Sequence, residues 1–447
     1  MTDLKKAGPG GLNYFSAVEL AKKLNSGEIT SVEIVQDCLK RISARDKDIG
    51  AWKYISADYV MEQAERCDKE KGSGLLHGIP IGIKDNLDTN DMPTGYGTHI
   101  YPNYLPDKDS ETIAKLRSAG AILLGKTVTS EFAGPFPGPT LNPYDSARTP
   151  GVSSMGSAAG VADYMMPLAN GSQTGGSIIR PASLCGIYGY KGSFGHISGD
   201  GIRHLKPSID TLGHFARSIE DLELMRCALT DDTPINFSDE CTLPKTIGIC
   251  KTGEWHAAQN EVISLIEKVK ECFTFSNTTL EEVILPNDFT DVMNRSFQVI
   301  YSWELRAAHE KEIKDHLDEF NPWFQWAVDY ANQLTETDFD EAISEANNVR
   351  AILDNIFREV DVILTPSALG EAPKDLSGIP KNNFNNLWTL MYVPCLNLPL
   401  FRGPNDLPVG LQVIGPQNED QNLLKNSNSI DLRIKEYFDK FPITLSQ

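Results

Sequence analysis

The 447-residue chain is predicted to be an α/β protein built on one large sheet. Segments with helical periodicity alternate along it with short apolar runs typical of buried strands. No linker rich in Pro, Gly or Ser divides it, so residues 1–447 are expected to form a single large domain. Hydrophobic residues make up 40% of the chain and charged residues 23%, which is enough apolar material for an extensive core.

The N-terminal segment, residues 16–72, is predicted to be helical. Ser16 to Glu19 and Thr30 to Glu33 both match the capping box that begins a helix, and Gly27 is a plausible stop between them. Two amphipathic helices should therefore precede the first long strand. Further along, the periodicity predicts helices at 111–118, 157–166 and 261–272, and strands at 121–124, 245–250 and 360–364.

The first long strand carries an unusual lysine. The run from His77 to Asn86 alternates apolar residues and reads as a buried strand with Lys84 near its end. Lysine is almost never buried without a partner, and a desolvated lysine can lose its proton and act as a base. Lys84 is therefore a candidate general base.

Two serine clusters follow in a Gly/Ala-rich frame, at 151–159 and 175–183. Glycine lets the backbone approach a ligand and tolerates positive φ, so the backbone N–H groups of Thr174, Gly175, Gly176 and Ser177 can point to one place. Donors arranged in this way form an oxyanion hole. The alternative for either cluster alone is a glycine-rich turn with solvated serines.

With these residues, the chain resembles the amidase signature family of serine hydrolases, which use a Ser–cis-Ser–Lys triad. The resemblance runs from about Ser16 to about Leu424 and rests on the serine clusters and on five further segments, 78–85, 119–127, 210–213, 364–366 and 407–412. It implies that Ser177 is the nucleophile, Ser153 the bridging serine and Lys84 the base, with Ser154 in a supporting role. It also implies a mixed, twisted central sheet flanked by helices.

Two departures from the family pattern lie beside the bridging serine. The family usually has Gly-Gly-Ser-Ser where this chain has Gly151-Val152-Ser153-Ser154, and Met155 stands where Ser or Gly is usual. A cis peptide between non-proline residues costs roughly 3–4 kcal/mol. Because the β-branched Val152 should crowd such a bond, a cis Val152–Ser153 peptide is not assured.

The resemblance implies an amidase that cleaves the C–N bond of a small, linear, non-peptide amide through an acyl-enzyme, without a cofactor or a metal. A carbamate, urethane or aryl-amide hydrolase would use the same triad. An amidotransferase subunit, which would need partner chains, and an inactive binding protein are further alternatives. The protein is expected to act as a monomer or homodimer.

Other chemistries fit the sequence less well. Residues 120–127 match G-x-x-x-x-G-K-[ST], but a phosphate-binding loop follows a strand, whereas here a helix precedes and the four intervening residues form an apolar strand. The G-x-S-x-G elbow is missing because Met155 and Ile179 replace its second glycine. His196 and His214, the histidines nearest to Ser177 in sequence, are expected to be structural.

The composition of the chain limits the kinds of partner and the location that are expected for it. A formal net charge of −20 argues against a nucleic-acid surface. No apolar run approaches the roughly 18 residues of a membrane span, and the N-terminus lacks the apolar core of a secretory signal, so a cytoplasmic location is expected. The eight cysteines are dispersed without metal-ligand spacing and are expected to be mostly buried free thiols.

Substrate contacts are predicted less directly. Arg180 could bind a substrate carboxylate, but bracing of its loop through backbone carbonyls is favoured because Pro181-Ala182 fixes the local geometry. Residues 289–358 are predicted to be a helical lid beside the substrate pocket, with Phe320, Trp323 and Trp326 forming one apolar stripe. The pocket candidates are Phe132, Phe136, Trp326 and Trp388.

Overall fold

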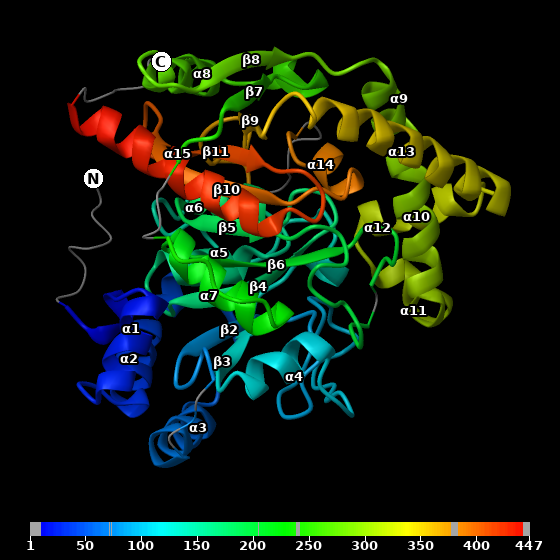
Figure 1. The fold of residues 1–447 in the computed structure, drawn as a ribbon. Helices are drawn as coiled ribbons and strands as arrows, with labels where there is room; N and C mark the ends of the chain where they lie inside the picture. The colour runs from blue at the N-terminus through cyan, green and yellow to red at the C-terminus, as the bar shows by residue number, and fades with distance from the viewer. Residues whose placement is uncertain are drawn as a thin grey trace.

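Strands from both halves of the chain join one sheet in the computed structural model, which describes residues 10–70, 72, 74–203, 205–237, 242–376 and 383–440. The sheet has eleven strands in the order β1-β3-β2-β4-β6-β5-β10-β11-β9-β7-β8 (Figure 1). The strands are β1 Trp52–Tyr54, β2 Pro80–Lys84, β3 Ile122–Thr127, β4 Leu168–Gln173, β5 Tyr188–Lys191, β6 Thr211–Ala216, β7 Thr246–Cys250, β8 Thr279–Val283, β9 Val362–Pro366, β10 Cys395–Arg402 and β11 Pro408–Ile414.

The sheet is mixed, as predicted. β3, β2 and β4 are parallel neighbours, as are β8, β7 and β9, whereas the pairs that join β4 to β9 through the centre are antiparallel. Parallel strands are usually buried on both faces and therefore rich in apolar residues. All of β2, β3 and β4 is buried, which explains why their sequences lack the alternation of half-exposed strands.

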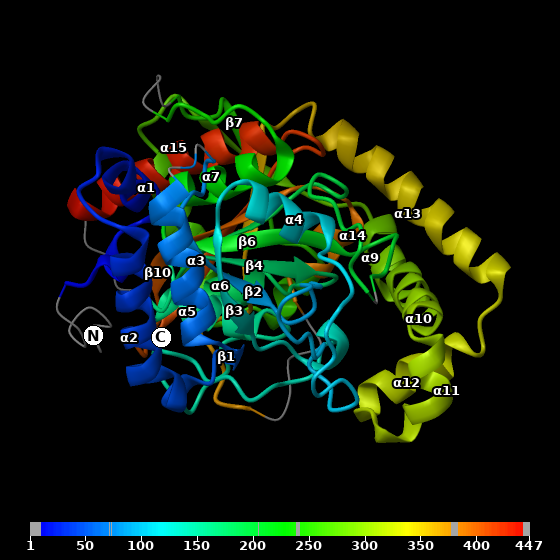
Figure 2. The same ribbon diagram turned by 90° about the horizontal axis from the view of Figure 1, so that it is seen from below.

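Helices surround this sheet (Figures 1 and 2). α1 to α3 lie at one side and α9 to α13 at the opposite side in both views. The helices are α1 Ala17–Ser26, α2 Ser31–Ile49, α3 Ala57–Glu70, α4 Glu111–Ser118, α5 Met155–Ala162, α6 Ile179–Cys185, α7 Ile219–Thr230, α8 Asn260–Phe273, α9 Asp288–Asn294, α10 Ser296–Ala308, α11 Glu310–His316, α12 Pro322–Ala331, α13 Glu336–Ile356, α14 Asn386–Leu390 and α15 Asp420–Lys440. Short 3-10 helices are η2 Leu12–Tyr14, η3 Glu131–Ala133, η4 Gly253–Ala257 and η5 Leu317–Glu319.

The N-terminal helices begin where the sequence predicts. Both capping boxes are formed, at Ser16 with Glu19 and at Thr30 with Glu33. Gly27 ends α1 in the left-handed conformation with φ 74°, which glycine adopts without strain. The prediction of a wholly helical segment was incomplete, because the three-residue strand β1 lies between α2 and α3 and pairs with β3.

Most other predicted elements are present with shifted ends. α4 has the predicted bounds, while β3 extends three residues beyond the predicted strand, to Thr127. α5 begins at Met155, directly after the first serine cluster's Ser154, and ends at Ala162, earlier than predicted. Its helix is made of small residues, so neighbouring backbone can approach it closely.

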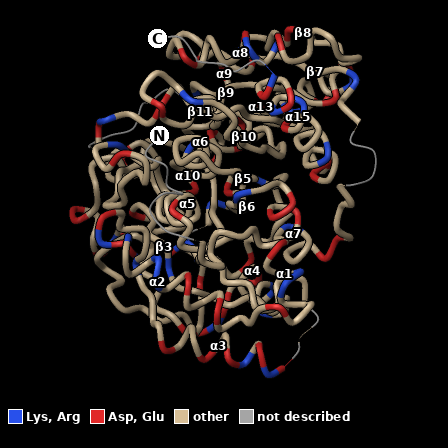
Figure 3. Tube along the Cα trace, turned by 90° about the vertical axis from the view of Figure 1, so that its left-hand side faces the viewer, with Lys and Arg blue, Asp and Glu red and all other residues tan. Residues whose placement is uncertain are grey.

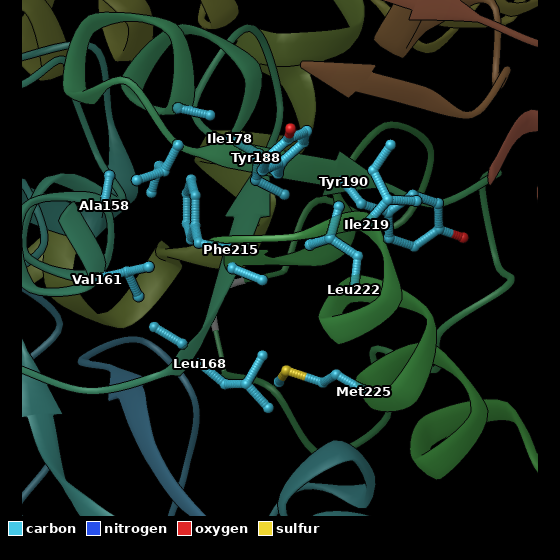
Figure 4. Packing of buried hydrophobic residues seen from close by; sticks show 14 of the residues in the cluster. Ala158, Val161, Leu168, Ile178, Tyr188, Tyr190, Phe215, Ile219, Leu222 and Met225 are labelled. Atoms are coloured by element: carbon cyan, nitrogen blue, oxygen red, sulfur yellow. The ribbon is translucent and has the colours of Figure 1, made fainter. Parts of the chain in front are cut away.

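The core beside the serine clusters is tightly filled. Figure 4 shows Phe215 of β6 between Ala158 and Val161 of α5 on one side and the side chains of α7 on the other. Each of these three labelled residues is less than 1% exposed. Buried apolar side chains stabilise by about 25 cal/mol per Å² removed from water. This packing fixes β4 and β6, the strands that lead into and lie beside the second serine cluster.

The segment 289–358 is helical, but its aromatic residues do not form one stripe. Phe320 precedes α12 and packs, 3% exposed, against Phe324 with ring centroids 4.9 Å apart. Trp323 instead faces Tyr301 of α10 at 5.1 Å, and Trp326 is 48% exposed and stacks on Tyr330. The stripe prediction was wrong because the helix starts at Pro322, so Phe320 does not follow helical spacing.

Charged residues are dispersed. Figure 3 shows Lys and Arg interspersed with Asp and Glu along the outer helices in that view. Within the described residues, no helix combines the length and apolar character needed to cross a membrane. Seven cysteines are described and all are free, six of them buried; Cys241 lies outside the described residues.

Candidate active site

Lys84 ends strand β2 inside the protein. It is 0% exposed, and its backbone N–H donates to Asn170 Oδ1 on the neighbouring strand β4 at 2.8 Å. β2 is hydrogen-bonded on both sides, to β3 and to β4. The position of the lysine backbone is therefore fixed by the sheet, and the side chain is shielded from solvent.

Three serine hydroxyls surround the Lys84 amine. Nζ lies 2.6 Å from Ser153 Oγ, 2.9 Å from Ser154 Oγ and 2.8 Å from Ser172 Oγ. Burial holds the pKa of Lys84 well below its ordinary value, against the opposing effect of the Asp210 carboxylate. A neutral amine has two N–H donors and one lone pair, so it can bond all three hydroxyls and accept a proton from one of them.

Ser153 has an unusual backbone conformation. Its φ is 72°, a left-handed value that costs a non-glycine residue on the order of 1–3 kcal/mol. All peptide bonds within the described residues are trans, so the Val152–Ser153 peptide differs from the cis bond of the family triad. The β-branched Val152 gives a steric reason for this difference. Ser153 nevertheless reaches Lys84, as the resemblance implies.

Ser177 lies in the turn between β4 and α6. It is 8% exposed, and its hydroxyl makes no hydrogen bond to any described residue, Ser153 included. The backbone N–H groups of Thr174, Gly175, Gly176 and Ser177 likewise have no partner in the described part of the chain. Four successive free donors next to a hydroxyl are what an oxyanion hole requires.

The two glycines of this loop are needed for space. Neither Gly175 nor Gly176 has positive φ, so the conformational freedom expected from the sequence is not used. A Cβ on Gly175 would lie 2.6 Å from Asn386 Oδ1, and one on Gly176 would lie 2.6 Å from Asn385 Oδ1. Both contacts are shorter than real side chains tolerate. The loop is packed against the segment that begins α14.

Gln173 and Thr389 hold the same loop from both ends. Gln173 Oε1 accepts the N–H groups of Ile178 and Ile179 at 2.8 and 3.1 Å. Its Nε2 donates to Thr389 Oγ1 at 3.0 Å, and that hydroxyl donates to the Gly175 carbonyl at 2.8 Å. In a trans peptide the N–H points away from the C=O. Fixing the Gly175 carbonyl therefore directs the Gly176 N–H to the opposite side.

A buried ion pair supports the start of the loop. Asp210 accepts a hydrogen bond from the Thr174 hydroxyl, and its Oδ2 lies 3.1 Å from Lys206 Nζ. Lys206 is 2% exposed and lies over the Tyr301 ring at 5.2 Å. Sequence reasoning found the 210–213 motif but gave Asp210 no role. The structure places its carboxylate between the Thr174 hydroxyl and the Lys206 amine.

Ser172 and Asn170 were also missed. Both are on β4, two residues apart and hence on the same face of the strand, where one contacts the Lys84 amine and the other its backbone. Their spacing of two residues on a strand, just before the Gly-Gly-Ser motif, could have indicated that both side chains face Lys84.

The two histidines nearest in sequence are separate from Ser177. His214 is buried on β6, its Nε2 lies 2.7 Å from the Leu222 carbonyl, and burial lowers its pKa to about 3. His196 Nδ1 lies 3.8 Å from Asp420 Oδ2. Both contacts are structural, as the sequence predicts. Lys126 of the G-x-x-x-x-G-K-T segment lies within β3 and donates to the Leu87 carbonyl at 2.5 Å.

The aromatic pocket candidates have different environments. Phe132 is 5% exposed and packs with Phe324 and Phe320, which places η3 against the 289–358 helices. Trp388 is fully buried on α14, one residue before Thr389, and its Nε1 has no partner. Phe136 is half-buried. Trp326 faces outward, so it is the candidate least suited to a pocket wall.

Arg180 does not brace its loop. It is 9% exposed, and no hydrogen bond or ion pair joins its side chain to a described residue. Its Nε is buried without a partner. The favoured interpretation from sequence, bonding to backbone carbonyls, is therefore wrong. Arg180 lies in the first turn of α6, which starts at Ile179, and lines a cavity.

No group of three or more His, Cys, Asp or Glu side chains in the described ranges could hold a metal ion. The groups that the described site residues offer are an amine, hydroxyls and backbone N–H groups. A hydroxyl next to free N–H donors, with a buried low-pKa amine one serine away, is suited to acyl transfer.

Comparison with known proteins agrees with this chemistry. The chain is 31% identical to the A-type subunit of glutamyl-tRNA(Gln) amidotransferase from Prochlorococcus marinus (strain NATL2A), over 94% of this chain and 97% of that one. A solved amidase structure superposes with TM-score 0.86 at 28% identity, covering 94% of this chain and 100% of the other. The peptide amidase of Stenotrophomonas maltophilia, at 24% identity and TM-score 0.81 over 94% and 97%, shares the fold. The family model Amidase matches residues 33–424, so the chain belongs to this family, the amidase signature enzymes.

Proposed function

We propose that this protein is a serine hydrolase that cleaves a small linear amide through an acyl-enzyme on Ser177. The observation that carries the proposal is the buried Lys84 amine, which lies 2.6 Å from Ser153 Oγ and whose pKa is held well below its ordinary value by desolvation. Burying a lysine costs stability, and strongly lowered pKa values are concentrated at functional sites, which favours a catalytic role for this group. The free N–H groups from Thr174 to Ser177 supply the second requirement.

The first step forms the acyl-enzyme. Neutral Lys84 takes the Ser153 proton while Ser153 takes the proton of Ser177, whose Oγ attacks the amide carbonyl carbon. Negative charge develops on the carbonyl oxygen and is bound by the loop N–H groups. The Ser153–Ser177 hydrogen bond is expected to form when substrate binds, since catalytic contacts are often loose in the free enzyme.

The second step releases both products. The C–N bond breaks as the proton returns from Lys84 through Ser153 to the departing nitrogen, leaving an ester on Ser177. A water molecule then attacks this ester with the same relay as its base, and the acid leaves. Each proton removed from a nucleophile is returned to a leaving group, so the enzyme ends unchanged.

Carbamates, urethanes and aryl amides are alternative substrates for the same groups. The relatives named as A-type subunits of glutamyl-tRNA(Gln) amidotransferase favour a second candidate, a subunit whose activity depends on partner chains. A binding protein without activity is disfavoured by the presence of Lys84, Ser153 and Ser177 together.

The test is hydrolysis by the purified chain alone. Aliphatic amides, anilides and carbamates would be compared by release of ammonia, amine or alcohol, with Ser177→Ala as the matched control. We expect turnover of at least one amide that Ser177→Ala lacks. Preference for carbamates would change the substrate class, and turnover that appears only with added partner chains would favour the amidotransferase subunit. Absence of turnover together with an unreactive Ser177 would overturn the proposal.

A further inference from the structure

Lys206 is a further buried lysine near the reactive groups, and the proposed relay does not use it. Its side chain is 2% exposed, and its Nζ lies 3.1 Å from Asp210 Oδ2. Lysine is almost never fully buried without a partner, so the Asp210 carboxylate accounts for the burial of this charge. Replacing a buried ion pair by apolar side chains is often neutral or stabilising, so stability alone does not account for the pair.

One turn carries both residues of the pair. The Asp210 N–H donates to the Lys206 carbonyl at 2.9 Å, and the Lys206 N–H donates to Asp210 Oδ2 at 2.9 Å. In the middle of the turn, the Ser208 N–H donates to the Glu304 carboxylate on α10 at 3.1 Å. The Tyr392 hydroxyl donates to the Ser208 carbonyl at 2.6 Å. The ion pair is therefore held in place by three separate parts of the chain.

The Asp210 carboxylate lies close to both parts of the proposed catalytic machinery. It accepts a hydrogen bond from the hydroxyl of Thr174, the first residue of the proposed oxyanion hole. Strand β4 ends one residue before Thr174, and its Ser172 hydroxyl lies 2.8 Å from the Lys84 amine. A carboxylate in this position opposes the negative charge that develops on the substrate oxygen. It also raises the pKa of Lys84 and so favours the protonated, inactive amine.

Lys206 counters both effects, because its cation is paired directly with the carboxylate. It lowers the pKa of Lys84, in opposition to Asp210. The neighbouring groups of α10 leave this balance to the pair. The Glu304 carboxylate accepts a backbone N–H of the turn, and burial raises the pKa of Tyr301 well above its ordinary value, so the ring 5.2 Å from Lys206 Nζ carries no charge. The side chains in contact with the Lys84 amine are serine hydroxyls, which are also uncharged.

We propose that Lys206 is a positioning residue that cancels the negative charge of Asp210, so that neither the lysine relay nor the oxyanion hole faces an uncompensated carboxylate. The inference rests on the proposed function and adds a residue to it. Asp210 can then hold the Thr174 hydroxyl, and with it the start of the proposed oxyanion hole, without an electrostatic cost to the reaction. Lys206 acts through Asp210 rather than on the substrate.

The experiment measures the pH dependence of Ser177 labelling by a neutral sulfonyl fluoride, which needs no known substrate. The midpoint of the acidic limb reports the ionisation of the relay amine, and the plateau rate reports the competence of the site. Wild type would be compared with Lys206→Met, with Asp210→Asn and with the double variant that has neither charge. Lys268→Met, which breaks an exposed ion pair with Glu271, is the matched control.

The two single variants should differ in the sign of their effect. Lys206→Met should raise the midpoint by about one pH unit and lower the plateau rate about tenfold, because the carboxylate loses its partner. Asp210→Asn should lower the midpoint, and the double variant should return it close to the wild-type value. The control should keep the wild-type midpoint. Unchanged midpoints in both single variants, or shifts in the same direction, would show a structural role only and would overturn the inference.

The double variant also covers the case in which Lys206→Met does not fold, because it contains no unpaired carboxylate. Asp210→Asn differs from it only in the Lys206 charge, so its midpoint should be the lower of the two; equal midpoints contradict the inference. Wild-type labelling without an ionisation that Lys84→Ala removes would overturn the relay and the inference together. Labelling that depends on Lys84 but not on the Lys206 charge would overturn the inference and leave the proposed function intact.

Discussion

Lys84 and Arg180 are both buried cationic residue types near Ser177, yet their surroundings differ. Lys84 touches three serine hydroxyls, whereas Arg180 touches no described polar partner. Lysine can become neutral when desolvated, while arginine keeps its proton. The comparison teaches that the protein itself satisfies the hydrogen bonds of the lysine amine, as the proposed proton relay requires. The buried arginine has no hydrogen-bond or ion-pair partner among the described residues.

The largest effect is expected from removing the proposed nucleophile. Ser177→Ala is expected to lower kcat about 10⁴-fold or more, because no acyl-enzyme can form. Turnover of the best amide from the panel measures the effect, and thermal unfolding checks that the fold is kept. If a sulfonyl fluoride labels another serine in active wild-type enzyme while Ser177 stays free, the assignment fails.

Replacing the lysine tests the other half of the relay. Lys84→Ala is expected to lower kcat about 10³- to 10⁴-fold, and the acidic limb of the wild-type pH profile should disappear. The sign follows from the lowered pKa: neutral Lys84 is the active form, so the wild-type rate falls as pH drops and the amine gains a proton. His196→Ala and His214→Ala are the comparison variants. A dead histidine variant beside an active Lys84→Ala would refute the lysine relay.

The three hydroxyls around Lys84 are expected to differ in effect. Ser153→Ala should cost about 10²- to 10³-fold in kcat, since water can replace the bridging hydroxyl only partly. Ser172→Ala should cost less and should shift the acidic limb of the pH profile, because Ser172 contacts the amine without bridging to Ser177. Equal losses in both variants, with equal pH profiles, would mean that the pocket acts only as a structural unit.

Thr389 gives a smaller and more specific test of the proposed oxyanion hole at residues 174–177. Thr389→Val keeps the shape but loses the hydrogen bond to the Gly175 carbonyl, so kcat should fall about tenfold with little change in KM. Thr389→Ser, which keeps the hydroxyl, should recover most of this loss. Were the serine variant as impaired as the valine variant, the hydrogen bond would not be the cause.

Trp326 should have the smallest effect. It is 48% exposed and stacks on Tyr330 at the surface, so Trp326→Ala is expected to change kcat/KM less than about twofold and stability by less than ~1 kcal/mol. Phe132→Ala is the contrasting variant, because its buried ring packs against Phe320 and Phe324 and its loss should cost about 3–5 kcal/mol. A large kinetic loss from Trp326→Ala would place it in the substrate pocket.

Periodicity and capping motifs predict the α/β class, whereas the mixed arrangement of the sheet was implied only by the resemblance to the amidase signature family. The resemblance also implied the Lys84–Ser153 contact, because each residue lies in a contiguous family motif that can be recognised locally. Strand β1 could not be predicted, because a strand of three residues is too short to show a periodic pattern. Ser172 was partly visible from its strand spacing with Asn170.

Other features depend on distant residues. Thr389 follows Gly175 by more than 200 positions, so its hydrogen bond to that carbonyl leaves no local pattern. Whether Arg180 has a partner depends on all the side chains around it, which come from distant parts of the sequence. The local sequence Pro181-Ala182 favoured an interpretation that was wrong. The sequence showed that Val152 replaces the usual glycine of the family before Ser153. Only the structure showed that the Val152–Ser153 peptide is trans.

The most direct test of the central claim is the pH dependence of Ser177 labelling by a neutral sulfonyl fluoride, followed by mass spectrometry. This measurement needs no knowledge of the substrate. The relay predicts that in wild type the labelling rate of Ser177 rises with pH through one ionisation, and that Lys84→Ala labels slowly without that ionisation. Labelling of Ser177 at the wild-type rate and with the wild-type pH dependence in Lys84→Ala would contradict the claim.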